Sequence, residues 1–178
     1  MSDDHATTVA SAHDIGRRRR EWLAGAQRYL VLDARPNGAP AEPVLRAALQ
    51  GGCEIVQLRE AALTPTEIVQ AARGFRRLCD AYDALFIVND RPDLALVCGA
   101  DGVHIELANA NPPQVRRFVG EDLLIGLSTH DDEQLGAAEG ECAIDYLIDD
   151  PASLLAAGSE LTRGTRDAAK PRFEHTKA

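Results

Sequence analysis

Short apolar runs alternate with segments that carry helix-start signals along most of this chain. The runs are mostly apolar and do not alternate with polar residues in a regular way, as expected for parallel strands buried on both faces. They cover residues 29–32, 54–58, 85–88, 103–105, 123–127 and 145–148. The intervening helices are predicted over 43–50, 64–82, 93–97 and 112–119, with one more starting near 131. The alternation predicts an α/β fold of about six parallel βα units with right-handed winding.

Both ends of the chain depart from this pattern. Residues 1–26 are polar and are predicted to be a disordered or helical N-terminal extension. Arg17–Arg20 within it favour a helix leading into the domain, with an RNA-binding arm as the alternative. The βα pattern defines a domain over residues 27–158, where residues 151–157 are interpreted as a last helix. Residues 159–178 mix charged and small residues and are predicted to be a disordered tail without strands.

Composition restricts the classes of function. The chain has 178 residues, enough for one domain with a core, and is 45% hydrophobic and 26% charged. A net charge of −9 argues against a nucleic-acid binder, which normally carries a basic face. No apolar run approaches the length of a membrane span and no signal peptide is recognisable, so we expect a cytoplasmic protein. Its four cysteines are widely spaced, which predicts small buried residues instead of a zinc site or disulfides.

Three polar motifs stand where three of the apolar runs end. They are Gln57-Leu58-Arg59-Glu60, Asn89-Asp90-Arg91 and Ser128-Thr129-His130. Parallel strands wound in one direction place all their carboxyl ends on the same face of the sheet, so these side chains should converge there. The spacing of the motifs therefore predicts an active site at that face.

The sequences around these motifs resemble thiamine-phosphate synthase, in the superfamily that also holds a thiazole tautomerase. Ile-Val-Gln-Leu-Arg-Glu, Phe-Ile-Val-Asn-Asp-Arg and Gly-Leu-Ser-Thr-His occur in order within residues 29–146. The resemblance implies a (β/α)8 TIM-type barrel and a transferase of thiamine biosynthesis. Such an enzyme condenses 4-amino-2-methyl-5-(diphosphooxymethyl)pyrimidine with a thiazole phosphate and releases pyrophosphate.

The resemblance also assigns roles to individual residues. It implies substrate contacts for Gln57, Leu58, Arg59, Glu60, Asn89 and Ser128, and catalytic roles for Arg59, Ser128 and His130. Asp90 would be a hard oxygen ligand for Mg²⁺, and spacing from Gly102 places Asn109 at the second metal position. The guanidinium of Arg59 offers a fork of donors for diphosphate oxygens.

Each of these residues also has a simpler explanation. Arg59 and Glu60 would form a surface ion pair at a strand end, and Asp90 would cap the helix that follows it. His130 would be an ordinary loop residue. His104, inside a strand, is interpreted as a packed residue or one that supports the site.

Departures from the family pattern indicate a C-terminally truncated or divergent member. Ala61 stands where the family has a lysine, and Asn109 replaces an aspartate. The family's Thr-Pro-Thr-Lys loop is replaced by Ile148-Asp149-Asp150-Pro151, and the last two strands are missing. The abrupt change to the tail is consistent with a frameshift or an early end of a longer reading frame.

An incomplete barrel of six strands would leave its first and last strands unpaired. We therefore expect one of three outcomes: an unstable chain, self-association through open sheet edges, or a requirement for a partner chain. Three functions stay open at this level. They are synthesis of thiamine phosphate with impaired activity, a thiazole tautomerase-like isomerase that uses His130 as acid or base, and a non-catalytic remnant.

Overall fold

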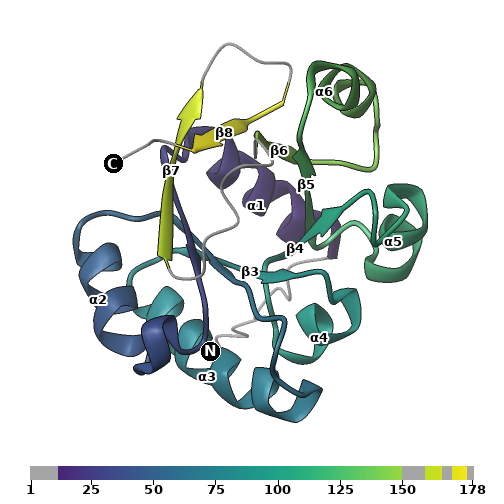
Figure 1. Ribbon diagram of the computed structural model, residues 1–178. Coiled ribbons are helices and arrows are strands. Elements are labelled where there is room, and N and C mark those ends of the chain that lie inside the picture. The colour runs from purple at the N-terminus through teal and green to yellow at the C-terminus, as the bar shows by residue number, and fades with distance from the viewer. Residues whose placement is uncertain (1–11, 150–158, 166–169, 176–178) are drawn as a thin grey trace, which may run out of the picture.

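The computed structural model describes residues 12–149, 159–165 and 170–175, and its core is a closed eight-stranded barrel (Figure 1). The strands are β1 Arg28–Leu32, β2 Ile55–Leu58, β3 Leu85–Asn89, β4 Gly102–Glu106, β5 Leu124–Thr129, β6 Tyr146–Asp149, β7 Ser159–Thr165 and β8 Arg172–His175. Strands β1 to β6 are parallel neighbours in chain order. The six predicted parallel strands and the TIM-type architecture are confirmed.

Helices surround the parallel part of the barrel. They are α1 Ala12–Gly25, α2 Glu42–Gln50, α3 Pro65–Ala81, α4 Pro92–Val97, α5 Pro112–Val119 and α6 Asp132–Glu139, with a 3₁₀ turn η1 at Pro36–Gly38. Helix α3 begins with a capping box, because Thr64 Oγ1 accepts from the Glu67 N–H while Glu67 Oε2 accepts from the Thr64 N–H. The helix interpreted over 151–157 lies outside the described residues. Among the described helices, none combines the length and apolar character that crossing a membrane requires.

Alternate positions along each strand divide the core into two layers. The outward side chains pack beneath the helices, whereas the inward ones fill the barrel. The inner cluster contains Leu23, Ala26, Tyr29, Val31, Ile55, Leu85, Ile87, Leu124, Tyr146, Ile148 and Phe173. Gly126 in β5 makes room for one of them, since a Cβ atom there would lie 2.1 Å from the Tyr146 ring.

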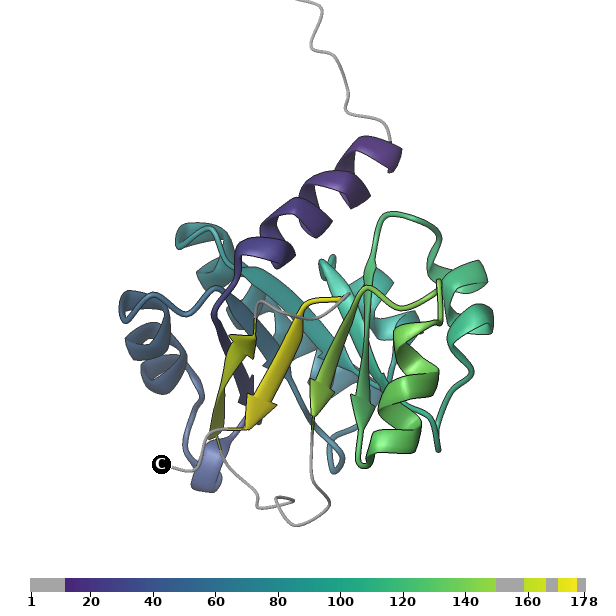
Figure 2. The same cartoon turned by 90° about the horizontal axis from the view of Figure 1, so that it is seen from above.

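The prediction that residues 159–178 contain no strand is wrong. Strand β7 runs antiparallel to β1, pairing Arg28–Leu32 with residues 159–163, and β8 runs parallel to β6 (Figure 2). The two strands also pair with each other in antiparallel register. The expected open edges are therefore absent, because main-chain groups of the tail satisfy those of β1 and β6. The physical basis for self-association through such edges is removed with them.

These two strands could not be predicted from composition, because their pairing depends on backbone hydrogen bonds and not on particular side chains. The β7 sequence Ser-Glu-Leu-Thr-Arg-Gly-Thr carries no apolar alternation. Strand β8 contains one large apolar residue, Phe173, whose side chain is fully buried in the barrel. The backbone N–H and C=O groups at the edges of β1 and β6 need hydrogen-bond partners, and the backbone of a polar segment can supply them.

Helix α1 lies across the end of the barrel from which the parallel strands start (Figure 2). Its Leu23 joins the inner cluster. Arg19 pairs with Asp101 at 3.0 Å, and Arg20 donates to Asp145 at 2.7 Å. The predicted helix is confirmed, and two arginines of its basic run bind acidic groups of the barrel, which the sequence did not reveal. These contacts disfavour the RNA-binding alternative.

The four cysteines are free thiols in the structure. Cys53 and Cys79 are buried and Cys98 is partly buried, but Cys142 is exposed, contrary to expectation. Burial raises the pKa of Cys53 to about 11 and that of Cys79 to about 12, so both thiols are protonated at neutral pH. Neither is therefore suited to act as a nucleophile.

Candidate active site

Three of the predicted site residues form one hydrogen-bonded group at the carboxyl ends of β2 and β3. Gln57 is 3% exposed, and its Nε2 donates to Oδ1 of Asn89. Asn89 Nδ2 in turn donates to Asp90 Oδ2 at 3.0 Å. The structure thus brings Gln57 of the first motif against Asn89 and Asp90 of the second.

Asp90 adopts a left-handed backbone conformation, with φ of +53°. Such a conformation is uncommon for a residue with a side chain, and outliers of this kind are concentrated at functional sites. Its N–H donates to the carbonyl of His104 at 2.8 Å, which ties the turn to β4. Asp90 does not cap the next helix, because Arg91 occupies the cap position of α4 and that helix has no side-chain cap.

The two oxygens of the Asp90 carboxylate differ in their hydrogen bonds. Its Oδ2 accepts from Asn89 and also from Asn109 Nδ2, at 3.1 Å. Its Oδ1 is buried and has no hydrogen-bond partner in the part of the chain that is described. The structure thus brings together Asp90 and Asn109, the two predicted metal ligands, although Asn109 presents its amide nitrogen in this arrangement.

A cation would suit this carboxylate. Burial raises the pKa of Asp90, and the nearby charge of Glu106 raises it further. Mg²⁺ is commonly held by one or two carboxylates together with phosphate oxygens and water, so Asp90 with an amide or carboxylate neighbour is an adequate donor set. The described residues contain no group of three His, Cys, Asp or Glu side chains arranged for a metal. Sequence reasoning missed Glu106, which follows His104 by two positions and lies at the end of β4.

Replacing Asp90 by asparagine should stabilise the chain at neutral pH. A carboxyl group whose pKa is raised on folding loses stabilising influence as pH rises from its unfolded value, about 3.9, through its folded value. We expect Asp90→Asn to be more stable than the unaltered chain at pH 7, because the charge of a half-buried carboxylate is removed. The gain should vanish below about pH 3. Urea unfolding across pH would measure it, and a pH-independent difference would contradict this origin.

Ser128 and His104 form a second buried pair on neighbouring strands. Their Oγ and Nε2 atoms are 2.9 Å apart, and both residues are almost fully buried. The His104 ring also lies against Tyr146, with 5.7 Å between ring centroids. The interpretation of His104 as a packed or supporting residue agrees with this position, and its contact to Ser128 links it to a predicted site residue.

The remaining residues of the first motif lie beside the loop after β1. Arg59 is partly buried and its Nε lies 3.7 Å from Asp33 Oδ1. Glu60 accepts from the N–H groups of Ala34 and Ala62, at 3.3 Å each, so it organises this loop. Leu58 belongs to the outer core cluster, and its side chain therefore points away from the barrel interior.

His130 lies exposed just before α6. Its N–H donates to Gln134 Oε1 at 3.1 Å, while Asp131 caps the helix through its side chain. The local geometry therefore fits a helix-entry residue as well as a group able to reach a ligand from solvent.

Two tyrosines inside the barrel were interpreted from sequence only as strand residues. Tyr29 donates to Gln57 Oε1 at 2.7 Å, and the hydroxyls of Tyr29 and Tyr146 are 2.9 Å apart. Both side chains are fully buried. A signal was present, because a buried tyrosine hydroxyl needs a partner and the inward positions of neighbouring strands are where it finds one.

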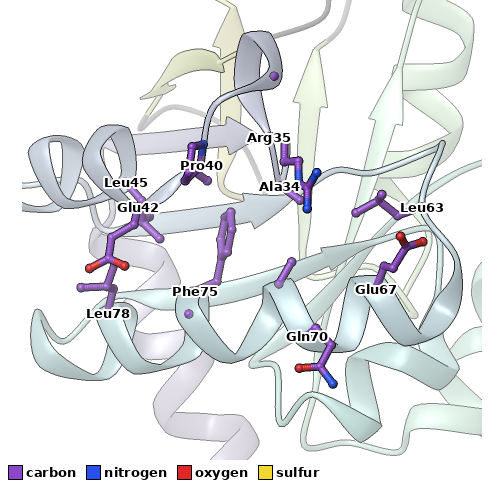
Figure 3. Close-up of a pocket in the computed structure, with 14 residues that line it drawn as sticks. Ala34, Arg35, Pro40, Glu42, Leu45, Leu63, Glu67, Gln70, Phe75 and Leu78 are labelled. Atoms are coloured by element: carbon purple, nitrogen blue, oxygen red, sulfur yellow. The ribbon is translucent and has the colours of Figure 1, made fainter.

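Two hollows lie near these elements. One, of about 390 Å³, borders Asp90 and Asn109 and extends toward α5. The other, of about 490 Å³, lies between the loop containing η1 and helix α3 (Figure 3). It has apolar walls that include Phe75 and Leu78, with Arg35 and Glu67 beside them. The first hollow alone contains predicted site residues.

Comparison with known sequences identifies a matching family and several relatives. Residues 28–150 match the protein family described as thiamine monophosphate synthase. The thiamine-phosphate synthase of Nostoc punctiforme is 39% identical over 136 residues, which cover 75% of this chain and 37% of that protein. The thiamine-phosphate synthase of Acidothermus cellulolyticus is 37% identical over 129 residues, covering 72% of this chain and 61% of that protein. The chain thus spans less than two thirds of the length of these relatives.

Solved structures give a concordant result. A thiamine phosphate pyrophosphorylase from Pyrococcus furiosus superposes with a TM-score of 0.60 at 33% identity, covering 67% of this chain and 57% of that chain. A dihydrodipicolinate synthase from Bacillus clausii superposes with a TM-score of 0.52 at 12% identity, covering 76% of this chain and 56% of that chain. The second likeness concerns the barrel fold alone.

Proposed function

The chain belongs to the thiamine monophosphate synthase family, and from this we propose that it joins an aminopyrimidine diphosphate to a thiazole phosphate with release of pyrophosphate. The observation that carries the proposal is the hydrogen-bonded group of Gln57, Asn89 and Asp90 at the strand ends. Its buried carboxylate oxygen without a partner among the described residues suits a cation that accompanies a diphosphate.

Each residue has a role that its chemistry supports. Arg59 would bind diphosphate oxygens through its guanidinium, and Gln57 would orient the aminopyrimidine. Ser128 would donate to the departing pyrophosphate. Because a hydroxyl has one hydrogen, that donation requires His104 Nε2 to carry the proton in the pair that it forms with Ser128.

We propose Mg²⁺ as the cofactor, held by Asp90 and by the side-chain oxygen of Asn109. When bound, the ion would neutralise charge on the leaving pyrophosphate. An asparagine ligand is uncharged, so we expect weaker affinity for the ion than two carboxylates would give. The amide of Asn109 would have to turn, since its nitrogen now donates to Asp90.

The test is a turnover assay with the purified full chain. We expect pyrophosphate to be released only when the pyrimidine diphosphate, the thiazole phosphate and Mg²⁺ are all present. Asp90→Asn should abolish release while the protein stays folded. No release, combined with no Mg²⁺-dependent binding of the pyrimidine diphosphate, would contradict the proposal. Isomerisation of a thiazole carboxylate phosphate without Mg²⁺ would instead support the tautomerase alternative.

A further inference from the structure

A continuous line of hydrogen bonds crosses the barrel interior from β6 to β3. It begins at Tyr146, passes through Tyr29 and Gln57, and reaches Asn89 and Asp90. Every member except the last two is almost fully buried. The line joins two tyrosines that the proposed function does not use to the residues that it does use.

The direction of each bond follows from the number of hydrogens available. Tyr29 uses its single hydroxyl hydrogen on Gln57 Oε1, so the bond between the two hydroxyls must be donated by Tyr146. Because Gln57 Oε1 accepts from Tyr29, the nitrogen of the Gln57 amide points toward Asn89. Donation from Gln57 to Asn89 Oδ1 then leaves the Asn89 nitrogen facing Asp90.

The carboxylate of Asp90 only accepts, so it holds the Asn89 nitrogen toward itself, and the Asn89 oxygen in turn accepts from the Gln57 nitrogen. The Tyr29 hydroxyl completes the line by donating to Gln57 Oε1. Without that hydroxyl, Gln57 Oε1 would be a buried acceptor that has lost this donor, and the Gln57 side chain would shift. A shifted Gln57 would loosen its bond to Asn89 and, through Asn89, one of the two amide contacts of Asp90.

Phe173 of β8 packs against both tyrosines. Its ring centroid lies 5.2 Å from that of Tyr29 and 6.0 Å from that of Tyr146, in an edge-on arrangement with the latter. The two tyrosine rings are 5.8 Å apart, so the three form one aromatic cluster. The strand that closes the barrel therefore contributes a buried side chain directly to the start of the hydrogen-bonded line.

We propose that Phe173, Tyr146 and Tyr29 are positioning residues that hold the Gln57 and Asn89 amides in place against Asp90, and thereby couple the C-terminal strand β8 to the site. The importance of this coupling for a diphosphate ligand rests on the proposed function, whereas the orientation of the amides does not. A purely structural role would make the same three residues matter for stability alone.

The first measurement is made without ligand, on the full chain. Side-chain amide signals of Gln57 and Asn89 are followed by NMR in Tyr29→Phe and in Phe173→Leu. We expect both variants to shift both signals. The matched control is Phe75→Leu, because Phe75 is also buried but lies in the outer layer against Phe86. Unmoved Gln57 and Asn89 signals in folded Phe173→Leu, or equal shifts in Phe75→Leu, would overturn the proposal.

The second measurement is binding of inorganic pyrophosphate with Mg²⁺. We expect Tyr29→Phe and Phe173→Leu each to weaken binding about tenfold, the effect of losing roughly one hydrogen bond's contribution. Adding Phe173→Leu to Tyr29→Phe should cost little more, because both changes act through Gln57. Full additivity would overturn the coupling. If the unaltered chain binds no pyrophosphate, the proposed function fails while the NMR result still decides the positioning role.

Discussion

Ending the chain after residue 158 should abolish cooperative folding. Strand β1 pairs with β7 over five residues, and β6 pairs with β8 over three. Removal of both strands would leave those backbone groups unpaired and expose the barrel interior. It would also remove Phe173, which is fully buried. Truncating a buried phenylalanine alone destabilises a protein by about 3–5 kcal/mol. That is a large part of the roughly 5–15 kcal/mol that stabilises a typical domain.

The measurement is thermal and urea unfolding by circular dichroism, combined with light scattering. We expect the shortened chain to melt without a sharp transition and to associate through its exposed strands. A control that keeps the tail but carries Phe173→Leu should retain a cooperative transition at a lower temperature. If the shortened chain were monomeric and unfolded like the full chain, β7 and β8 would not be what closes the barrel.

The contrast between β3 and β7 explains why most of the barrel was predictable and its closure was not. Leu85–Val88 are apolar on both faces because they are covered by helices outside and side chains inside, and that double burial is visible in the sequence. Strand β7 is held by main-chain pairing to β1, which leaves no residue signature. The sequence indicated only that β1 and β6 need strands to pair with. It did not indicate which segment of the chain supplies those strands.

The candidate site divides along similar lines. Motifs at strand ends predicted Gln57, Asn89 and Asp90 because chain topology alone brings them together. Tyr29 and Tyr146 were hidden inside apolar runs, where a tyrosine suggests packing first. Arg20 and Asp145 were missed for a different reason: their contact joins positions 125 residues apart, and no local pattern records it.

Arg59→Ala should weaken Mg²⁺-dependent pyrophosphate binding by about a hundredfold or more, because charge-assisted hydrogen bonds contribute roughly 1.5–3 kcal/mol each. The guanidinium also compensates Asp33, whose Oδ1 lies 3.7 Å from Arg59 Nε. Without Arg59, Asp33 would lose the attraction of this cation, and its negative charge would add to that of the incoming diphosphate. Titration calorimetry with inorganic pyrophosphate and Mg²⁺ would measure the change.

Three further variants separate these two contributions. Arg59→Lys keeps the charge but loses the planar fork, so we expect a smaller loss of about tenfold. Adding Asp33→Asn to Arg59→Ala should recover part of the affinity if repulsion by Asp33 matters. Arg77→Ala is the matched control, since Arg77 is an exposed arginine near the C-terminal end of α3, paired with Glu42 at 3.7 Å. Unchanged binding in Arg59→Ala would mean that the diphosphate binds elsewhere. A guanidinium that contacts the diphosphate contributes to its affinity, so its removal must weaken binding.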